Sequence, residues 1–248
     1  MLKSTPIVPK TMHNLTIIGT SHIARQSLKE VKEAIEQLKP DIVAIELDRK
    51  RFPALFEKKQ RSIGFSGIFR VGVKGFLFAA FGAWAERKLG ESVGMKPGAE
   101  MKTAVIEARK HKAKIALIDQ DIDITLRKLS AALTWKEKWN FVADIFKGVF
   151  SRKPEFSFDL RTVPAEELIE KMIAKLKVRY PNVHKVLIEE RNIVMARNVN
   201  RLQKENPEKK ILVVIGAGHK EGLEELLSHA PEVSITYHLP KGMKLHTE

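Results

Sequence analysis

Leu15-Thr-Ile-Ile-Gly-Thr-Ser-His22, near the start of the chain, and Leu212-Val-Val-Ile-Gly-Ala-Gly-His219, near its end, follow one pattern. Each is a short apolar run, then a glycine, two small residues and a histidine. A short apolar run that ends at a glycine is typical of a buried strand. Glycine and its small neighbours permit a sharp turn and let a ligand approach the backbone closely, which makes Gly19, Gly216 and Gly218 candidate binding positions. The pattern predicts two core strands, each followed by a histidine.

Further strands are expected on the same grounds at Asp41–Leu47, Lys114–Ile118 and Val233–Leu239. Ser27-Leu-Lys-Glu30 has the form of a capping box and predicts a helix that runs to Lys39. A helix between two strands favours a right-handed crossover, so we expect the strands at 15–19 and 41–47 to form a parallel pair.

About ninety residues between the third and fourth strands carry no strand signal. A second capping box, Thr134-Trp-Lys-Glu137, predicts a helix to about Phe150, and a later helix is expected from about Asn182 to Lys204. The expected fold is α/β, with a mainly parallel sheet, flanking helices and an inserted helical subdomain. We expect a single domain over 1–248, with helical insertions at about 49–112 and 122–205.

The composition excludes several classes of protein. The 248 residues contain no cysteine, which rules out disulfides, thiolate zinc sites and thiol nucleophiles. The longest uncharged aromatic-rich stretch, Gly75–Ala85, is far shorter than the roughly 20 residues of a membrane span, and the first twelve residues resemble no signal peptide. We therefore expect a cytoplasmic chain that is soluble or peripheral to a membrane.

The candidate site combines His22 and His219 with Glu46. Glu46 follows the apolar run Ile42–Ile45, and a partly buried carboxylate needs a cation, a metal or hydrogen-bond donors. Open α/β sheets bind ligands at the carboxyl ends of their strands, where all three residues are expected. Two imidazoles and one carboxylate suit zinc, manganese, cobalt or iron, or equally a metal-free acid/base site. A salt bridge from Glu46 to Arg49 or Arg51 is the simpler alternative.

Six ordered motifs make the chain resemble a known family. They are GTSH at 19–22, VAIELD at 43–48, PGAEM at 97–101, LIDQDIDIT at 117–125, EERN at 189–192 and GAGH at 216–219. In identity and order they resemble the TraB family of the TraB/PrgY pheromone-shutdown type, especially its archaeal members, with a more distant similarity to GumN and Tiki proteins. The resemblance implies a fold shared with erythromycin esterases and ChaN-like proteins.

Tiki relatives act as metal-dependent proteases, so the resemblance implies that His22, Glu46 and His219 hold a divalent metal ion. It adds Glu100 and Arg191 as catalytic candidates, and Arg191 also suits binding of a substrate carboxylate. The simpler alternative for Glu100 is that it complements the dipole of a helix at its first turn. The simpler alternative for Arg191 is that it pairs with a nearby glutamate. Asp119 and Asp121 either join this site or cap the next helix. The remaining histidines (13, 111, 184, 229, 238 and 246) are expected to be surface or packing residues.

Two positions depart from the family pattern. Asn192 stands where the family often has Asp, and Gln120 stands where it has Arg. If either residue orients the catalytic groups, the change lowers or abolishes activity.

A basic, aromatic segment follows the second expected strand. Residues 48–74 have a net charge of +6, and seven phenylalanines lie between Phe52 and Phe81. This composition suits an anionic membrane surface, an apolar lid over the site, or a helix packed on the core. The net charge of +14 alone also suits nucleic acid, but no nucleic-acid-binding motif is present, so we do not expect that partner.

The leading interpretation is a metal-dependent, peptidase-like hydrolase that acts on a peptide or small molecule at a membrane surface. The alternative is a non-catalytic protein that binds a peptide or signal and regulates its level. Assembly into a homo-oligomer is compatible with both.

Overall fold

The computed structural model describes residues 10–12, 14–20, 25–57, 98–150 and 165–229. Within these ranges the chain forms one five-stranded sheet with the order β1-β2-β5-β3-β4. The strands are β1 (Lys10–Met12), β2 (Leu15–Thr20), β3 (Ile42–Ile45), β4 (Lys114–Leu117) and β5 (Ile211–Gly216). The pairs β2–β5, β5–β3 and β3–β4 are parallel, and β1 is an antiparallel edge strand. The predicted mainly parallel α/β fold is confirmed.

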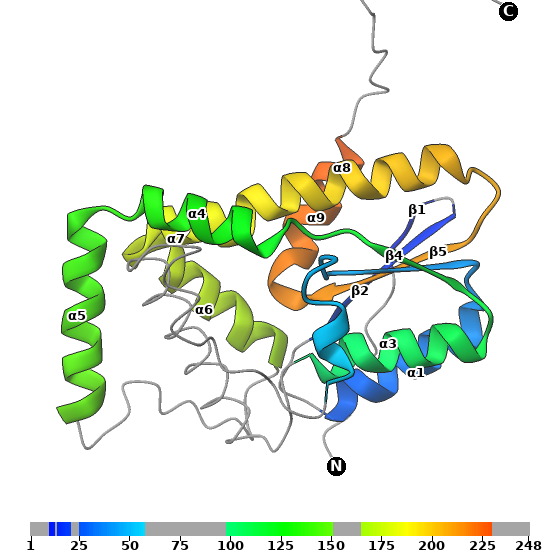
Figure 1. Cartoon of the computed structure of the whole chain (residues 1–248), viewed down its shortest axis with the longest axis horizontal. Coiled ribbons are helices and arrows are strands. Elements are labelled where there is room, and N and C mark those ends of the chain that lie inside the picture. Colours follow the sequence, from blue (N-terminus) through cyan, green and yellow to red (C-terminus); the bar gives the residue numbers. More distant parts are fainter. Residues whose placement is uncertain (1–9, 13, 21–24, 58–97, 151–164, 230–248) are drawn as a thin grey trace, which may run out of the picture.

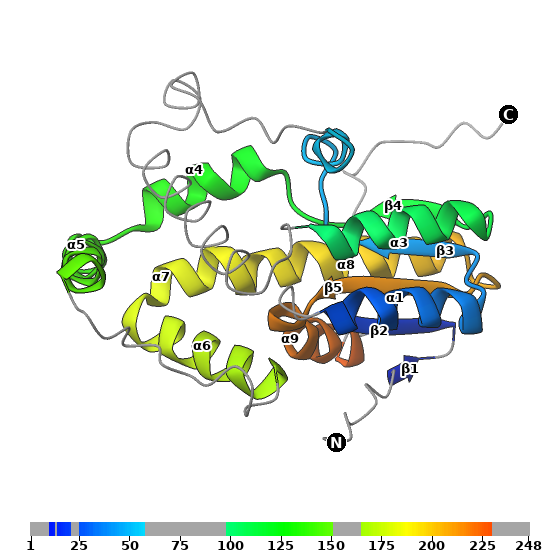
Figure 2. The ribbon, with the colours of Figure 1, turned by 90° about the horizontal axis from the view of Figure 1, so that it is seen from below.

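Helices cover both faces of the sheet (Figures 1 and 2). α1 (Arg25–Leu38) and α3 (Ala99–Lys110) lie on one face, and α8 (Glu190–Glu205) and α9 (Ala217–Ser228) lie on the other. Side chains of a strand alternate between its two faces. In β5, Val213 and Ile215 accordingly pack toward α8 and α9, whereas Leu212 and Val214 pack toward α1 and α3. The apolar runs are continuous because the central strands are buried on both faces.

The expected pairing of the first two core strands is wrong in one respect. β2 and β3 are parallel members of the same sheet, but β5 lies between them. A crossover helix makes the two strands that it connects parallel. It does not determine whether a later strand is inserted between them. The carboxyl ends of β2 and β5, each with its glycine, are therefore direct neighbours: Thr20 pairs with Gly216.

The two capping boxes have different outcomes. Thr134 and Glu137 form the predicted box, with the Glu137 N–H donating to Thr134 Oγ1 (3.3 Å) and the Thr134 N–H donating to Glu137 Oε2 (3.0 Å). This box opens α5 (Trp135–Phe150), whose bounds match the prediction. Ser27, in contrast, lies inside α1, which begins at Arg25. The same four-residue pattern can occur within a helix, because capping also requires a non-helical first residue.

The predicted helical subdomain is also present. It comprises α4 (Ile122–Ala132), α5, α6 (Ala165–Arg179) and the short α7 (Pro181–His184), and α5 and α6 extend to one side of the sheet in both ribbon views. Its own small core includes Leu129, Val183 and Val186. The helix predicted from about Asn182 to Lys204 is continuous, but it is divided by a π-helical segment, η2 (Lys185–Glu189).

The short turn η1 (Pro53–Leu55) follows β3, and most of the basic, aromatic segment lies outside the described residues. The predicted strand at Val233–Leu239 lies outside them as well. No helix in the described ranges combines the length and the apolar character that a membrane span requires.

Candidate functional site

The candidate site is a charged cluster at the carboxyl edge of the sheet, centred on Arg191. Arg191 lies in the first turn of α8, and its guanidinium contacts Glu46, after β3, and Asp119, after β4. Arg191 Nε donates to Asp119 Oδ1 (3.0 Å), and Nη2 donates to Asp119 Oδ2 (2.7 Å) and to Glu46 Oε1. Three elements far apart in the sequence therefore meet at one side chain.

The π-helical segment η2 contributes directly to the placement of Arg191. Arg191 Nη1 donates to the carbonyl oxygen of Leu187 (3.1 Å), while the N–H of Glu190 bonds to Lys185 one residue further back than in an α-helix. π-Helical turns are rare and occur frequently at functional sites. This one orients the guanidinium toward the sheet edge.

His219 completes the cluster from the third residue of α9. Its Nε2 lies 3.1 Å from Arg191 Nη1 and 3.3 Å from Glu46 Oε1, and its Nδ1 lies 2.7 Å from Asn192 Oδ1. Arginine has only donors, so Nε2 accepts and the proton is on Nδ1, where it bonds to Asn192. The Nε2 lone pair therefore faces the carboxylate and the guanidinium.

Glu46 is held by two further groups. The backbone N–H of Gly216 donates to its Oε2 (2.6 Å), and its own N–H bonds to the carbonyl of Val214 (3.0 Å). The partner of Glu46 is thus Arg191, and the expected alternatives, Arg49 and Arg51, do not fill this role. Arg51 instead pairs with Asp48 and Asp119.

The arginines stay charged in this environment. Burial alone lowers the pKa of Arg191, but Glu46 and Asp119 outweigh that effect and raise it above the ordinary value. Burial likewise lowers the pKa of Arg51, and the nearby Asp119 and Asp48 outweigh this effect and raise it. A buried charge is stable only with partners of opposite sign. Three carboxylates and two guanidiniums satisfy this condition within the cluster.

The other predicted site residues have separate positions. His22 lies outside the described residues, two positions after β2 ends. Glu100 is buried as the second residue of α3. Gly19 is in close contact with the start of α9, since a Cβ there would lie 3.2 Å from Ala217 Cα. Gly216 precedes α9 and its N–H serves Glu46, while Gly218 lies in the first turn of that helix.

The two departures from the family pattern differ in consequence. Asn192 presents an oxygen to His219, as an aspartate would, so the hydrogen bond to the imidazole is retained without a charge. Gln120 directs its side chain to Thr125 (2.8 Å) in α4. Only its backbone N–H serves the cluster, through Asp119 Oδ1 (2.7 Å). Asp121 caps α4 by accepting from the N–H of Asp123, which leaves Asp119 as the aspartate of the site.

The sequence alone does not distinguish Asp119 from Asp121 as the aspartate of the site, and it identifies Asn192 only as a departure from the family pattern. Asn192 follows Arg191 directly, and this position is the one local signal that it belongs to the site. Asp119 belongs to the site because it follows β4, which lies beside β3 in the sheet. The neighbourhood of β3 and β4 was not predictable from local pattern.

Fold and site together define an α/β protein with a charged histidine–carboxylate–arginine cluster at the carboxyl edge of a mainly parallel sheet. The chain belongs to the TraB/PrgY/gumN family, whose model matches residues 8–230. It is 33% identical to an uncharacterized protein of Methanocaldococcus jannaschii over 86% of this chain and 53% of that protein. It is 25% identical to the human TraB domain-containing protein over 90% of this chain and 67% of that protein, and the mouse protein gives the same values. The chain thus spans about half the length of the archaeal relative.

Proposed function

We propose that the chain is a metal-dependent hydrolase of peptide-like substrates, with His22, Glu46 and His219 as metal ligands. The observation that supports this most is the geometry of His219. Its Nε2 faces Glu46 Oε1 at 3.3 Å, and its Nδ1 is fixed by Asn192. Metal-binding histidines usually have the second ring nitrogen fixed in this way. Ligation through Nε2 would require Arg191 Nη1, which lies 3.1 Å from it, to withdraw.

The donor set fits an ion of the zinc class, since nitrogen and carboxylate oxygen are its usual protein ligands besides thiolate. A bound ion of this class lowers the pKa of its water and polarises a carbonyl group. Nη2 of Arg191 contacts the oxygen of Glu46 that faces His219, and ligation there requires that contact to loosen. Arg191 would remain held through Nε by Asp119.

The protein's own groups then have defined roles. Glu46 would accept a proton from the attacking water and return it to the amine that leaves when the C–N bond breaks, and Arg191 would donate to the oxygen of the substrate carbonyl as negative charge develops on it. Arg191 suits this role because its charge is permanent and its donors form a planar fork. Gly216 and Gly218 would allow the substrate backbone to approach the sheet edge. Glu100 is proposed as a second catalytic carboxylate.

One observation favours the alternative of a non-catalytic binding protein. Its own arginines offset two of the three carboxylates of the described cluster, and in the described part of the chain no three ligand-bearing side chains at this edge are close enough to share an ion. A peptide carboxylate could then displace Glu46 or Asp119 from Arg191 without catalysis.

The deciding experiment is a titration of the metal-free chain with Co²⁺ and Zn²⁺, in parallel with metal analysis of the purified protein. We expect His22→Ala, Glu46→Gln and His219→Ala each to weaken binding at this site by about tenfold or more. Because ligands act as a unit, the double histidine variant should be little worse than either single one. Affinity should also fall below about pH 6, where imidazole becomes protonated.

The control is His229→Ala, an exposed histidine at the end of α9 that should change nothing. A second arm incubates the metal-loaded chain with a peptide mixture and detects new termini by mass spectrometry, with Glu46→Gln as the inactive form. Failure of the wild-type chain to bind a divalent ion at micromolar concentration would falsify the metal mechanism. Metal binding without new termini would instead support the binding protein.

A further inference from the structure

A second group of potential metal ligands lies on the helices α1 and α3. Glu36 in the last turn of α1, Glu107 near the end of α3 and His111 just after α3 each offer one ligand atom. These three atoms lie within 4.8 Å of one another. This group is at the end of α1 and α3 away from the Arg191 cluster, because both helices begin at the carboxyl edge of the sheet.

The spacing within this group is compatible with a shared metal ion. Glu107 and His111 are four positions apart, so they share one side of a helical turn. Glu36 comes from the neighbouring helix, which packs beside α3 in the same core cluster (Figure 2). The three donors therefore come together only in the folded chain.

Two carboxylates give the group itself a negative charge. The carboxyl end of a helix carries partial negative charge, and Glu36 and Glu107 add two carboxylates at two such ends. They repel each other, and Glu107 is buried, with 6% of its surface exposed. Their nearest counter-charges are Lys32 for Glu36 (3.7 Å) and Lys110 for Glu107 (2.7 Å). The exposed Lys32–Glu36 pair is weak in water, whereas Lys110 forms a direct hydrogen bond with the buried Glu107, and an ion would have to displace Lys110.

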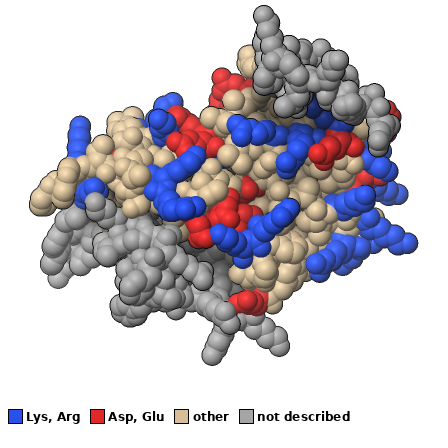
Figure 3. Space-filling view, turned by 45° about the horizontal axis from the view of Figure 1, so that its top comes forward, with Lys and Arg blue, Asp and Glu red and all other residues tan. Residues whose placement is uncertain are grey.

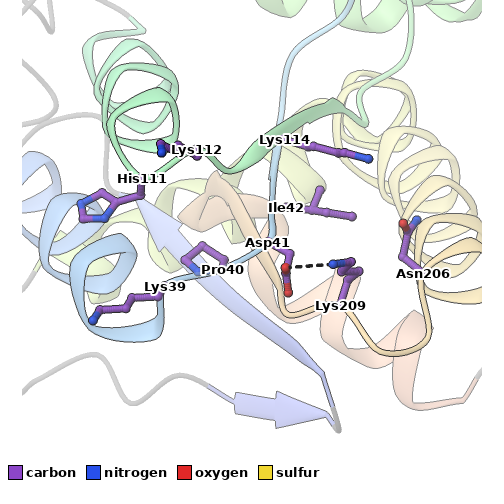
Figure 4. A pocket seen from close by; sticks show the side chains of 9 residues that line it. All are labelled: Lys39, Pro40, Asp41, Ile42, His111, Lys112, Lys114, Asn206 and Lys209. Carbon is purple, nitrogen blue, oxygen red and sulfur yellow. Dashed lines mark hydrogen bonds and ion pairs between the residues drawn. The ribbon is translucent and has the colours of Figure 1, made fainter.

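The group is accessible from solvent. His111 lines an open cavity of about 300 Å³ at the amino edge of the sheet, whose charged lining residues are Asp41 and the lysines Lys39, Lys112, Lys114 and Lys209. Figure 4 shows the imidazole of His111 projecting from the end of α3 toward α1. Glu36 and His111 are both exposed, so an ion can reach these two side chains from solvent.

We propose that Glu36, Glu107 and His111 bind a divalent transition-metal ion of the zinc class, which fastens α1 to α3. One imidazole and two carboxylates suit Zn²⁺ or Co²⁺, whereas Mg²⁺ and Ca²⁺ prefer oxygen ligands alone. The site is independent of the proposed hydrolase centre. It also changes the interpretation of His111, which the sequence alone placed among surface or packing residues.

The test measures the visible absorption of bound Co²⁺ and the rise in melting temperature on adding Zn²⁺, in the full chain. A ligand that binds only the folded state raises its melting temperature. We expect His111→Ala and Glu36→Gln, both at exposed positions, to weaken this binding by about tenfold or more and to abolish the thermal shift from this ion. Glu33→Gln is the matched control, because it removes an exposed carboxylate of α1 one turn earlier.

Stoichiometry separates this site from the proposed catalytic one. If both exist, then at an ion concentration that just fills the intact sites the wild-type chain binds two ions, His111→Ala and His219→Ala each bind close to one, and the double variant binds little. If only the α1–α3 site exists, His219→Ala binds one ion as the wild type does. Unchanged Co²⁺ absorption and thermal shift in both His111→Ala and Glu36→Gln, or no Zn²⁺ effect on the wild type at micromolar concentration, would overturn the proposal.

Discussion

Arg191 contacts Glu46, Asp119 and His219, which follow β3, follow β4 and lie in α9 respectively. Its guanidinium satisfies Glu46 and Asp119 at once, and its Nη1 fixes the acceptor nitrogen of His219. Removing one partner from a buried ionic group costs about 3–5 kcal/mol, because the remaining charge is left without compensation. Substitution of Arg191 would therefore lower the stability of the fold as well as alter the site. A less destabilising substitution is needed to probe the site alone.

Gly222 offers that gentler change. A Cβ at this position would lie 2.4 Å from Asn192 Nδ2, so Gly222→Ala must displace the amide that fixes His219. We expect a loss of about 1–3 kcal/mol in unfolding free energy, typical of overpacking. We also expect a changed NMR signal for the His219 imidazole.

Urea unfolding and histidine NMR of Gly222→Ala measure the two effects. Glu221→Ala, a neighbouring exposed position on α9, is the control and should leave both unchanged. A stable Gly222→Ala chain with an unaltered His219 signal would show that Asn192 does not position the imidazole.

At the scale of elements, Glu137 joins the start of α5 to α7. Besides closing the capping box, its carboxylate accepts from the Asn182 N–H (2.8 Å) and Nδ2 (3.0 Å). Burial alone raises the pKa of Glu137, but the bonds from Thr134 and Asn182 outweigh it and hold the pKa below the ordinary value of 4.5.

This lowered pKa predicts a pH dependence of stability. A carboxyl group with a depressed pKa in the folded state stabilises above its unfolded value, and the contribution is lost as the pH falls through the folded value. We expect the stability difference between the wild type and Glu137→Gln to be full at pH 6 and to shrink below about pH 4.5. Urea unfolding of both chains between pH 6 and 3 measures it, with Glu170→Gln, an exposed glutamate of α6, as the control. A constant difference would contradict this account.

At the scale of the whole molecule, the dominant property is the net charge of +14. On the face seen in Figure 3, basic side chains are interspersed with acidic ones. The concentrated basic charge is in residues 48–74, which carry +6 beside the phenylalanines. We therefore propose peripheral binding to anionic membranes through residues 48–85, with each basic residue contributing about 1 kcal/mol near the lipid.

Co-sedimentation with anionic vesicles should be strong at low salt and should fall as salt screens the charges. Lys58→Glu with Lys59→Glu should weaken it markedly. The same charge change at exposed positions of the long helix, Lys185→Glu with Lys204→Glu, should weaken it less. Equal binding to neutral vesicles, or none to either kind, would be incompatible with an electrostatic mechanism.

Local pattern was sufficient for the α/β class, the parallel strands, the helical subdomain and the bounds of α5. Burial on both faces requires continuous apolar strands, and a capping box acts over four residues, so both signals lie within a short stretch of sequence. The apolar run before Glu46 and the glycine–histidine pattern before His219 predicted both residues at one sheet edge, because parallel strands end together. Only the tertiary structure decided that β5 separates β2 from β3. It also decided that Glu46 pairs with Arg191, where Arg49 or Arg51 was expected, and that Glu36 lies close to His111. These depend on strand order, on a π-helical turn and on helix packing, which arise from contacts between residues far apart in the chain.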